Sequence, residues 1–205
     1  MSEPQLTADP ERRPRRRVPA EERREQLIEA AVVEFARGGL HGTAVADVAR
    51  RVGVAQPYVF ALFPTKRDLF LAAAERGFER AANVFREAAA AFERGAAPAD
   101  CEDVLSAMGR AYDELLERDR DCLMLQHQTY AACGEEEIRG PVRRRYAEMV
   151  ELVRELSGAP AEELDDFFRH GMACNVAAAM GVENLSTEAP WVAAELSRAG
   201  AQDRS

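Results

Sequence analysis

The sequence predicts an all-α fold, with a three-helix N-terminal unit followed by a larger helical body. Apolar residues recur at intervals of three and four in every long segment of the 205-residue chain. No segment combines strict two-residue alternation with strand-forming residues. Glycine and proline residues separate the apolar segments, as they do at helix ends.

The N-terminal unit begins with a helix expected from about Ala20 to Arg37, which Gly38 and Gly39 should end. The second helix is expected over Val45–Arg51, with Thr43 as its cap.

A third helix should start near Ala55, since Gly53 breaks the second and Pro57 is tolerated in a first turn. Pro64 should end it, and Thr65 should cap the next helix.

The body should open with a long helix over residues 65–92, roughly 42 Å at about 1.5 Å per residue. Gly95 and Pro98 end it, and helices over 99–118 and 119–132 follow.

The last two helices differ from the others. Apolar residues between Val142 and Leu156 step by four and three, as in a heptad seam that packs against a partner helix. The helix over 161–180 is apolar on nearly all sides after Phe167 and should be buried. We expect both to form a four-helix homodimer interface; the alternative is that both pack within one chain. The expected interface residues are Val142, Tyr146, Met149, Val153, Phe168, Gly171, Met172, Asn175 and Ala179.

The formal net charge of −9 is unevenly distributed. Residues 1–70 hold twelve basic and ten acidic residues, and the remainder holds fifteen and twenty-six. The acidic excess therefore lies outside the N-terminal unit. Residues 1–18 are expected to form a flexible basic arm. A twin-arginine export signal is disfavoured because no apolar region follows the arginines, and no apolar run is long enough for a membrane span, so we expect a cytoplasmic protein without membrane contact.

The four cysteines show no CxxC pairing and are most simply buried thiols. His170 and Cys174 have helical i,i+4 spacing, but two ligands do not make a zinc site. No metal or cofactor is expected.

Residues 45–64 fit a helix-turn-helix. Ala49 is small where the two helices touch, and Gly53 suits the left-handed backbone of the turn. Apolar residues on either side hold the second helix across the first. The alternative interpretation of this pattern alone is a helical hairpin without a ligand.

Two motifs carry a more specific resemblance: Gly42-Thr43-x-Val45-x-Asp47-Val48-Ala49 and Phe63-Pro64-x-Lys66-x-x-Leu69-Phe70. Over residues 20–70 the chain resembles the TetR family of transcriptional regulators. The chain departs from the family at Phe60, where Tyr is usual, and at Leu62, where a polar residue is common. Both departures remove polar contacts at the end of the recognition helix.

The resemblance implies that the N-terminal unit binds double-stranded operator DNA. Gln56 and Tyr58 start the helix that enters the major groove, where Gln pairs with adenine. Lys66, the sole lysine, stands at a helix N-terminus. A cation there lowers helix stability, so a role in binding a phosphate explains it better than a role in stability. The expected DNA-binding residues are Thr43, Val45, Ala46, Ala55, Gln56, Pro57, Tyr58, Phe60 and Lys66.

The expected organisation is a basic arm over 1–18, a DNA-binding domain over 19–64 and a ligand-binding and dimerisation domain over 65–205. The resemblance implies that a small-molecule effector binds the body and changes the spacing of the two DNA-binding units, most simply releasing a repressor. The expected ligand-binding residues are Phe85, Met108, Tyr112, Met124, His127, Gln128 and Tyr130.

Two rival functions fit an all-α chain of this kind less well. A helical protein that binds lipids or small hydrophobes without touching DNA would lack Lys66 and the polar recognition positions, and both are present. An enzyme is disfavoured because the sequence has no phosphate loop, nucleophile motif or carboxylate–histidine cluster with metal spacing.

Overall fold

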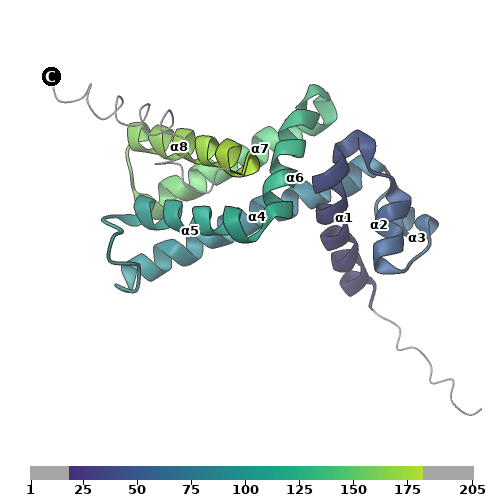
Figure 1. Cartoon of the computed structure of the whole chain (residues 1–205), viewed down its shortest axis with the longest axis horizontal. Coiled ribbons are helices and arrows are strands. Elements are labelled where there is room, and N and C mark those ends of the chain that lie inside the picture. The colour runs from purple at the N-terminus through teal and green to yellow at the C-terminus, as the bar shows by residue number, and fades with distance from the viewer. Residues whose placement is uncertain (1–18, 182–205) are drawn as a thin grey trace, which may run out of the picture.

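The computed structural model describes residues 19–181, and it confirms the all-α prediction: this part holds eight α-helices, one short 3-10 helix and no strand (Figure 1). The basic arm predicted over 1–18 lies outside the described residues, and none of the described helices is long and apolar enough to cross a membrane. The elements are α1 (Ala20–Gly42), α2 (Val45–Val52), α3 (Gln56–Leu62), α4 (Lys66–Glu93), α5 (Val104–Arg118), α6 (Arg120–Ala131), η1 (Ala132–Gly134), α7 (Glu136–Ser157) and α8 (Ala161–Ala179).

Helices α1, α2 and α3 form a head around a small apolar core. Phe35 of α1 meets Phe70 of α4 edge to face, with ring centroids 5.0 Å apart. Val48 of α2 and Val59 of α3 are completely buried beside them. These side chains hold the head against the start of α4.

The regular part of α1 ends at Gly38 and Gly39, as predicted. Gly39 has non-helical backbone angles, with a φ of 61° in the left-handed region, and a short helical segment continues beyond this kink to Gly42. A side chain there would also meet Gln128 of α6, because a Cβ would lie 2.4 Å from the Gln128 Oε1. The positive φ favours glycine at the kink, and the absence of a side chain leaves room for the end of the Gln128 side chain.

Thr43 does not cap α2, contrary to the prediction. The N-cap is Ala44, and the Thr43 hydroxyl donates instead to the Glu34 carbonyl oxygen at 3.0 Å. Thr43 is buried, and Gly38 makes room for it, since a Cβ at Gly38 would lie 2.6 Å from the Thr43 hydroxyl. The residue ties the α1–α2 corner together.

Two other local predictions are confirmed. Gly53 adopts the left-handed conformation in the α2–α3 turn, with a φ of 73°. Thr65 caps α4 through a reciprocal capping box with Asp68.

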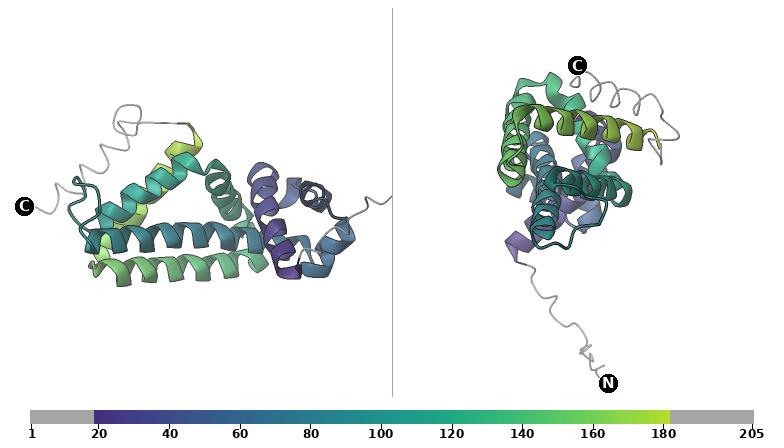
Figure 2. Two further views of the ribbon diagram at one scale, coloured as in Figure 1. Left: turned by 90° about the horizontal axis from the view of Figure 1, so that it is seen from below. Right: turned by 90° about the vertical axis from the view of Figure 1, so that its left-hand side faces the viewer.

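The body is built on α4, which runs away from the head with α5 and α7 beside it, while α8 packs on α5 and α7 (Figure 2). Its core gathers apolar side chains from all of these helices, among them Phe85, Met108, Val153 and Leu164. Helix α6 lies between the body and the head and packs along α1. The head core includes Leu125 of α6, so the two parts share buried surface.

The heptad seam on α7 faces the interior of the chain. Val142 and Ile138 join the head core, while Met149 and Val153 are buried in the body core. The prediction that Val142, Met149 and Val153 lie at a dimer interface is therefore wrong for this arrangement, and the alternative of packing within one chain accounts for them. The heptad spacing matches because α4 itself supplies the facing helix.

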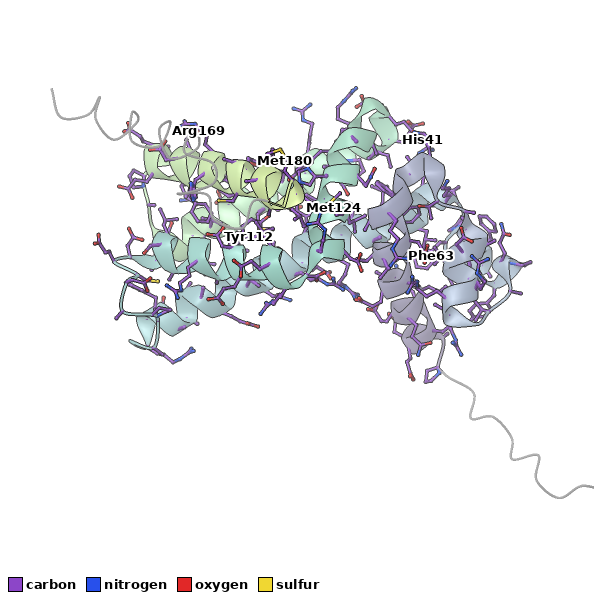
Figure 3. All side chains as sticks on the ribbon, in the orientation of Figure 1. His41, Phe63, Tyr112, Met124, Arg169 and Met180 are labelled. Carbon is purple, nitrogen blue, oxygen red and sulfur yellow. The ribbon has the colours of Figure 1, made fainter. Side chains whose placement is uncertain are left out.

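Helix α8 is buried on one face only, so the prediction that it is buried on nearly all sides is wrong. Its inner face contributes Cys174, Asn175 and Ala177 to the interior. Its outer face exposes three apolar side chains that are four residues apart, Met172, Val176 and Met180, and Met180 stands at the helix end in Figure 3.

Candidate DNA interface and ligand cavity

Helix α3 presents its first turn to solvent at the end of the head away from the body (Figure 1). Gln56 and Pro57 are exposed, and Tyr58 and Phe60 are each 39% exposed. Val59 is completely buried and anchors the helix. Large apolar side chains without a partner on a rigid helix are typical of a contact surface. The polar and aromatic side chains predicted to meet DNA are therefore free to do so.

The other predicted DNA contacts divide into exposed and buried residues. Ala46 and Ala55 are exposed beside the α3 surface. Val45 and Thr43 are buried, so their side chains cannot reach a ligand outside the head. Their roles are structural: Val45 fills the head core, and Thr43 closes the α1–α2 corner.

Lys66 is the first residue of α4, and its ammonium group donates to the His41 carbonyl oxygen at 3.1 Å. This bond uses one of three N–H donors and holds the lysine between the end of α1 and the start of α4. The neighbouring Arg67 pairs with Glu135 at 2.9 Å. Lys66 therefore retains donors for an anion, whereas Arg67 is already neutralised.

A cavity of about 640 Å³ lies in the body, bounded by α4, α5, α6, α7 and α8. Its walls are mainly apolar, with a few polar groups, as in sites for small organic molecules. Three of the predicted ligand-binding residues, Phe85, Tyr112 and Tyr130, line it.

The other four predicted ligand-binding residues do not line the cavity. Met108 is fully buried in the body core, and Met124 packs against the head core. His127 is turned to the α8 backbone, with its Nε2 3.1 Å from the Asn175 carbonyl oxygen. Gln128 lies against Gly39 of α1. Helical periodicity places all four on α5 or α6 but does not show which neighbour each one faces.

Several residues predicted for the dimer interface line the cavity instead. Small and polar positions on α8 were interpreted as an interface stripe, but α8 turns them inward. The predicted interface residues that line the cavity are Tyr146 and Met149 of α7 and Phe168, Gly171 and Asn175 of α8. Met172 borders the cavity but remains 37% exposed on the outer face of α8. Ala179 is half-buried and packs on the body core.

A polar cluster spans the cavity from α5 to α6 and α8. It is centred on Tyr112 of α5, which is labelled in Figure 3. The Tyr112 hydroxyl lies 2.9 Å from Asn175 Oδ1 and 3.0 Å from Gln126 Oε1. Gln126 in turn donates to the Tyr130 hydroxyl at 2.9 Å. Burial raises the pKa of Tyr112, so the phenol stays protonated. Gln126 is not among the residues predicted from the sequence, although it lies four positions before Tyr130 on the same helix face.

Aromatic rings form the apolar wall beside this cluster. Phe85 lies 5.6 Å from Tyr112 and 5.7 Å from Phe167, measured between ring centroids. Phe168 continues the chain of rings, 5.3 Å from Phe167 and 5.8 Å from Tyr146. A flat apolar molecule would find ring faces and edges here.

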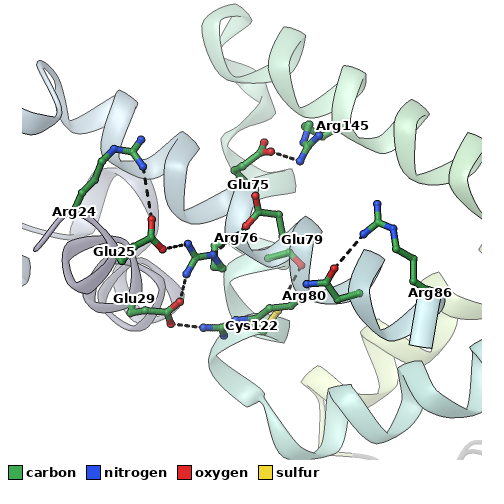
Figure 4. Close-up of polar contacts among 12 residues, drawn as sticks. Arg24, Glu25, Glu29, Glu75, Arg76, Glu79, Arg80, Arg86, Cys122 and Arg145 are labelled. Atoms are coloured by element: carbon green, nitrogen blue, oxygen red, sulfur yellow. Dashed lines mark hydrogen bonds and ion pairs between the residues drawn. The ribbon is translucent and has the colours of Figure 1, made fainter. Parts of the chain in front are cut away.

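Ion pairs connect the cavity wall to the head (Figure 4). Asp119, which lines the cavity, pairs with Arg80 of α4 at 2.6 Å, and Arg80 also pairs with Glu29 of α1. Arg76, one turn earlier, pairs with Glu25 and Glu29 of α1. A shift of α4 or of the start of α6 would therefore move charges that are bonded to the head.

Comparison with known proteins covers both parts of the chain. The family of bacterial regulatory proteins described as the tetR family matches residues 27–73, from α1 into α4. The HTH-type transcriptional activator FasR of Mycolicibacterium smegmatis is 35% identical over 72 residues, which are 35% of this chain and 33% of FasR. The chain thus matches only a third of that relative's length.

Solved structures extend the likeness through the body. A TetR-like transcriptional regulator from Rhodococcus sp. RHA1 is similar, with a TM-score of 0.64, 19% identity, and coverage of 90% of this chain and 99% of that one. The multidrug-binding protein EbrR, solved in complex with ethidium, has a TM-score of 0.61, 23% identity, and coverage of 88% and 99%. The whole described architecture, and not the head alone, is therefore shared.

Proposed function

We propose that this chain is a transcriptional regulator of the TetR family, whose family model matches residues 27–73. It binds operator DNA as a homodimer and changes its affinity when a small molecule enters the body cavity. The observation that carries the proposal is the exposed first turn of α3 on a head whose α1 is joined by ion pairs to the cavity wall. These ion pairs connect the surface proposed to bind DNA with the cavity proposed to bind an effector.

The DNA-binding role is divided between reading and anchoring. Gln56 and Tyr58 would meet base edges, because the N-terminal residues of a recognition helix lie deepest in the major groove. Lys66 would contact phosphate from the start of α4, where its remaining N–H donors join the positive end of the helix dipole. Ala46, Ala55, Pro57 and Phe60 would complete the surface. The DNA-binding domain remains residues 19–64 in this proposal.

The proposed dimer uses the outer face of α8. Met172, Val176 and Met180 are exposed and share that face, and a second copy would bury them. Two heads held in this way would bind half-sites about 34–36 Å apart, one helical turn of DNA.

The proposed effector is an apolar or aromatic molecule with a few hydrogen-bonding groups. The ring-lined wall suits its apolar part, and the Tyr112–Gln126–Asn175 cluster offers both donors and acceptors. To release DNA, the effector must bind more tightly to the arrangement of heads that does not fit the operator.

The sign of regulation depends on where the operator lies relative to the promoter. We propose repression, with the regulator acting in the cytoplasm, where its operator would be. In vitro transcription from an operator-bearing promoter should then fall as protein is added. A rise would instead make the protein an activator, as the name of FasR states for that protein.

The deciding experiment selects bound DNA from a random pool and titrates the recovered operator and scrambled DNA at several salt concentrations. Lys66→Ala should weaken binding to all sequences alike and lower the salt slope by about one per protomer. Gln56→Ala should cost about 1–3 kcal/mol on the operator and relax preference at one base pair per half-site. Arg86→Ala, which removes an exposed charge on the body, is the control.

The proposal would be overturned if all three variants had the same DNA affinity and the same salt dependence. It would also be overturned if the wild-type protein showed no preference for palindromic DNA. The cavity would then favour the rival function, a hydrophobe-binding protein that does not touch DNA.

A further inference from the structure

A cluster of three potential metal ligands lies in the body, apart from the Tyr112 hydrogen bonds. Asp113 of α5 meets His170 and Cys174 of α8, and one ligand atom from each lies within 4.8 Å of the other two. The Cys174 sulfur is 3.4 Å from the His170 Nε2. Asp113 and His170 also line the cavity.

We propose that Asp113, His170 and Cys174 form a binding site for a transition-metal ion of the Zn²⁺ class. Thiolate, imidazole and carboxylate are the three side-chain groups that Zn²⁺ binds in proteins. A tetrahedral ion with Zn–S of about 2.3 Å and Zn–N of about 2.0–2.1 Å holds those two atoms about 3.6 Å apart. The observed separation is already close to this value, and the helical i,i+4 spacing of His170 and Cys174 maintains it.

The carboxylate of the cluster lacks a basic partner. The His170 Nε2, 3.4 Å from the Cys174 sulfur, is the ring nitrogen placed to bind the ion, whereas the other ring nitrogen, Nδ1, is buried without a hydrogen-bond partner. No arginine or lysine among residues 19–181 forms an ion pair with Asp113, although that carboxylate is only partly accessible. Burying an unpaired charge is unfavourable, and a bound cation would offset that cost.

Binding of the ion releases one proton, that of the Cys174 thiol. The bound ion would replace the thiol proton, which leaves to solvent. Three protein ligands leave the fourth position to water or to a donor atom of a molecule in the cavity.

The test uses the purified full-length protein and Co²⁺, which reports its own coordination. One equivalent per chain should produce a near-ultraviolet thiolate-to-cobalt band and the intense visible bands of tetrahedral cobalt, and Zn²⁺ should abolish both. Cys174→Ser should remove the near-ultraviolet band, and His170→Gln and Asp113→Asn should each weaken binding at least about tenfold.

Two matched variants serve as controls. Cys122→Ser changes another buried cysteine that lines the cavity but lies outside the cluster, and His127→Gln changes a histidine that contacts the α8 backbone. Both should retain the cobalt spectrum. A rise in the unfolding temperature of the wild-type protein with Zn²⁺ gives a readout that needs no variant.

The inference is wrong if no thiolate band appears, if the band survives Cys174→Ser, or if Cys122→Ser removes it equally. The cluster would then be an ordinary hydrogen-bonded group between α5 and α8. The readout involves no DNA, so failure of the proposed regulator function would leave this result standing, and the reverse is also true.

Discussion

At the scale of single residues, Tyr112 is the polar side chain on which the cavity cluster is centred. Its hydroxyl has one proton but faces two amide groups, those of Asn175 and Gln126. It therefore donates to one amide and, when the other is turned, accepts from that one. The residue joins α5 to α6 and α8 through a single buried oxygen.

Tyr112→Phe should lower the free energy of unfolding by about 1–3 kcal/mol, because it leaves buried amide groups unsatisfied. Urea denaturation monitored by circular dichroism measures the change. Tyr58→Phe is the matched control, because Tyr58 is exposed and should show almost none. A loss equal to that of Tyr58→Phe would mean that the Tyr112 cluster contributes nothing to stability.

At the scale of elements, α7 and α8 differ from the predictions made from their sequences. The regular seam of α7 is covered within the chain, whereas α8 retains an apolar outer face. A charge introduced at Met149 or Asn175 would therefore be placed in the interior and would disrupt folding, and it would not test dimerisation.

Val176→Glu should dissociate the dimer while leaving the fold intact, because Val176 is 44% exposed and a carboxylate there stays hydrated in the monomer. Met149→Asp should instead cost several kcal/mol of stability, since it buries an unpaired charge. Sedimentation and thermal unfolding of both variants separate the two effects. If the Val176→Glu protein remains fully dimeric at micromolar concentration, the dimer interface does not lie on this face of α8.

At the scale of the whole molecule, the charged residues between α1 and α4 connect head and body. Arg76 pairs with Glu25, Glu29 and Glu79, and its side chain is only 20% exposed. An isolated surface pair contributes little to stability, but a partly buried arginine that bridges two helices contributes more.

Arg76→Met should destabilise the protein by about 1–3 kcal/mol at low salt and by less at 1 M salt, where exposed charges are screened. Arg154→Met is the control, because Arg154 is exposed and, among the described residues, pairs only with Glu151 on its own helix. Urea titrations at two salt concentrations measure both. If the two variants behave alike, the network does not hold the head to the body.

The sequence by itself determined the features that depend on neighbours along the chain. Gly53 in the α2–α3 turn, the Thr65–Asp68 cap and the exposed Gln56 follow from backbone conformation and spacing over a few residues. The helix count and the family resemblance followed from the same local patterns.

Only the tertiary structure decided which side chains meet across helices. Periodicity marks an apolar face but does not show what covers it, so α7 was assigned a partner chain although α4 covers its seam. For the same reason the sequence does not predict that Asp113 meets His170 and Cys174. Asp113 lies more than fifty positions before the other two, and the three come together only because α8 packs on α5.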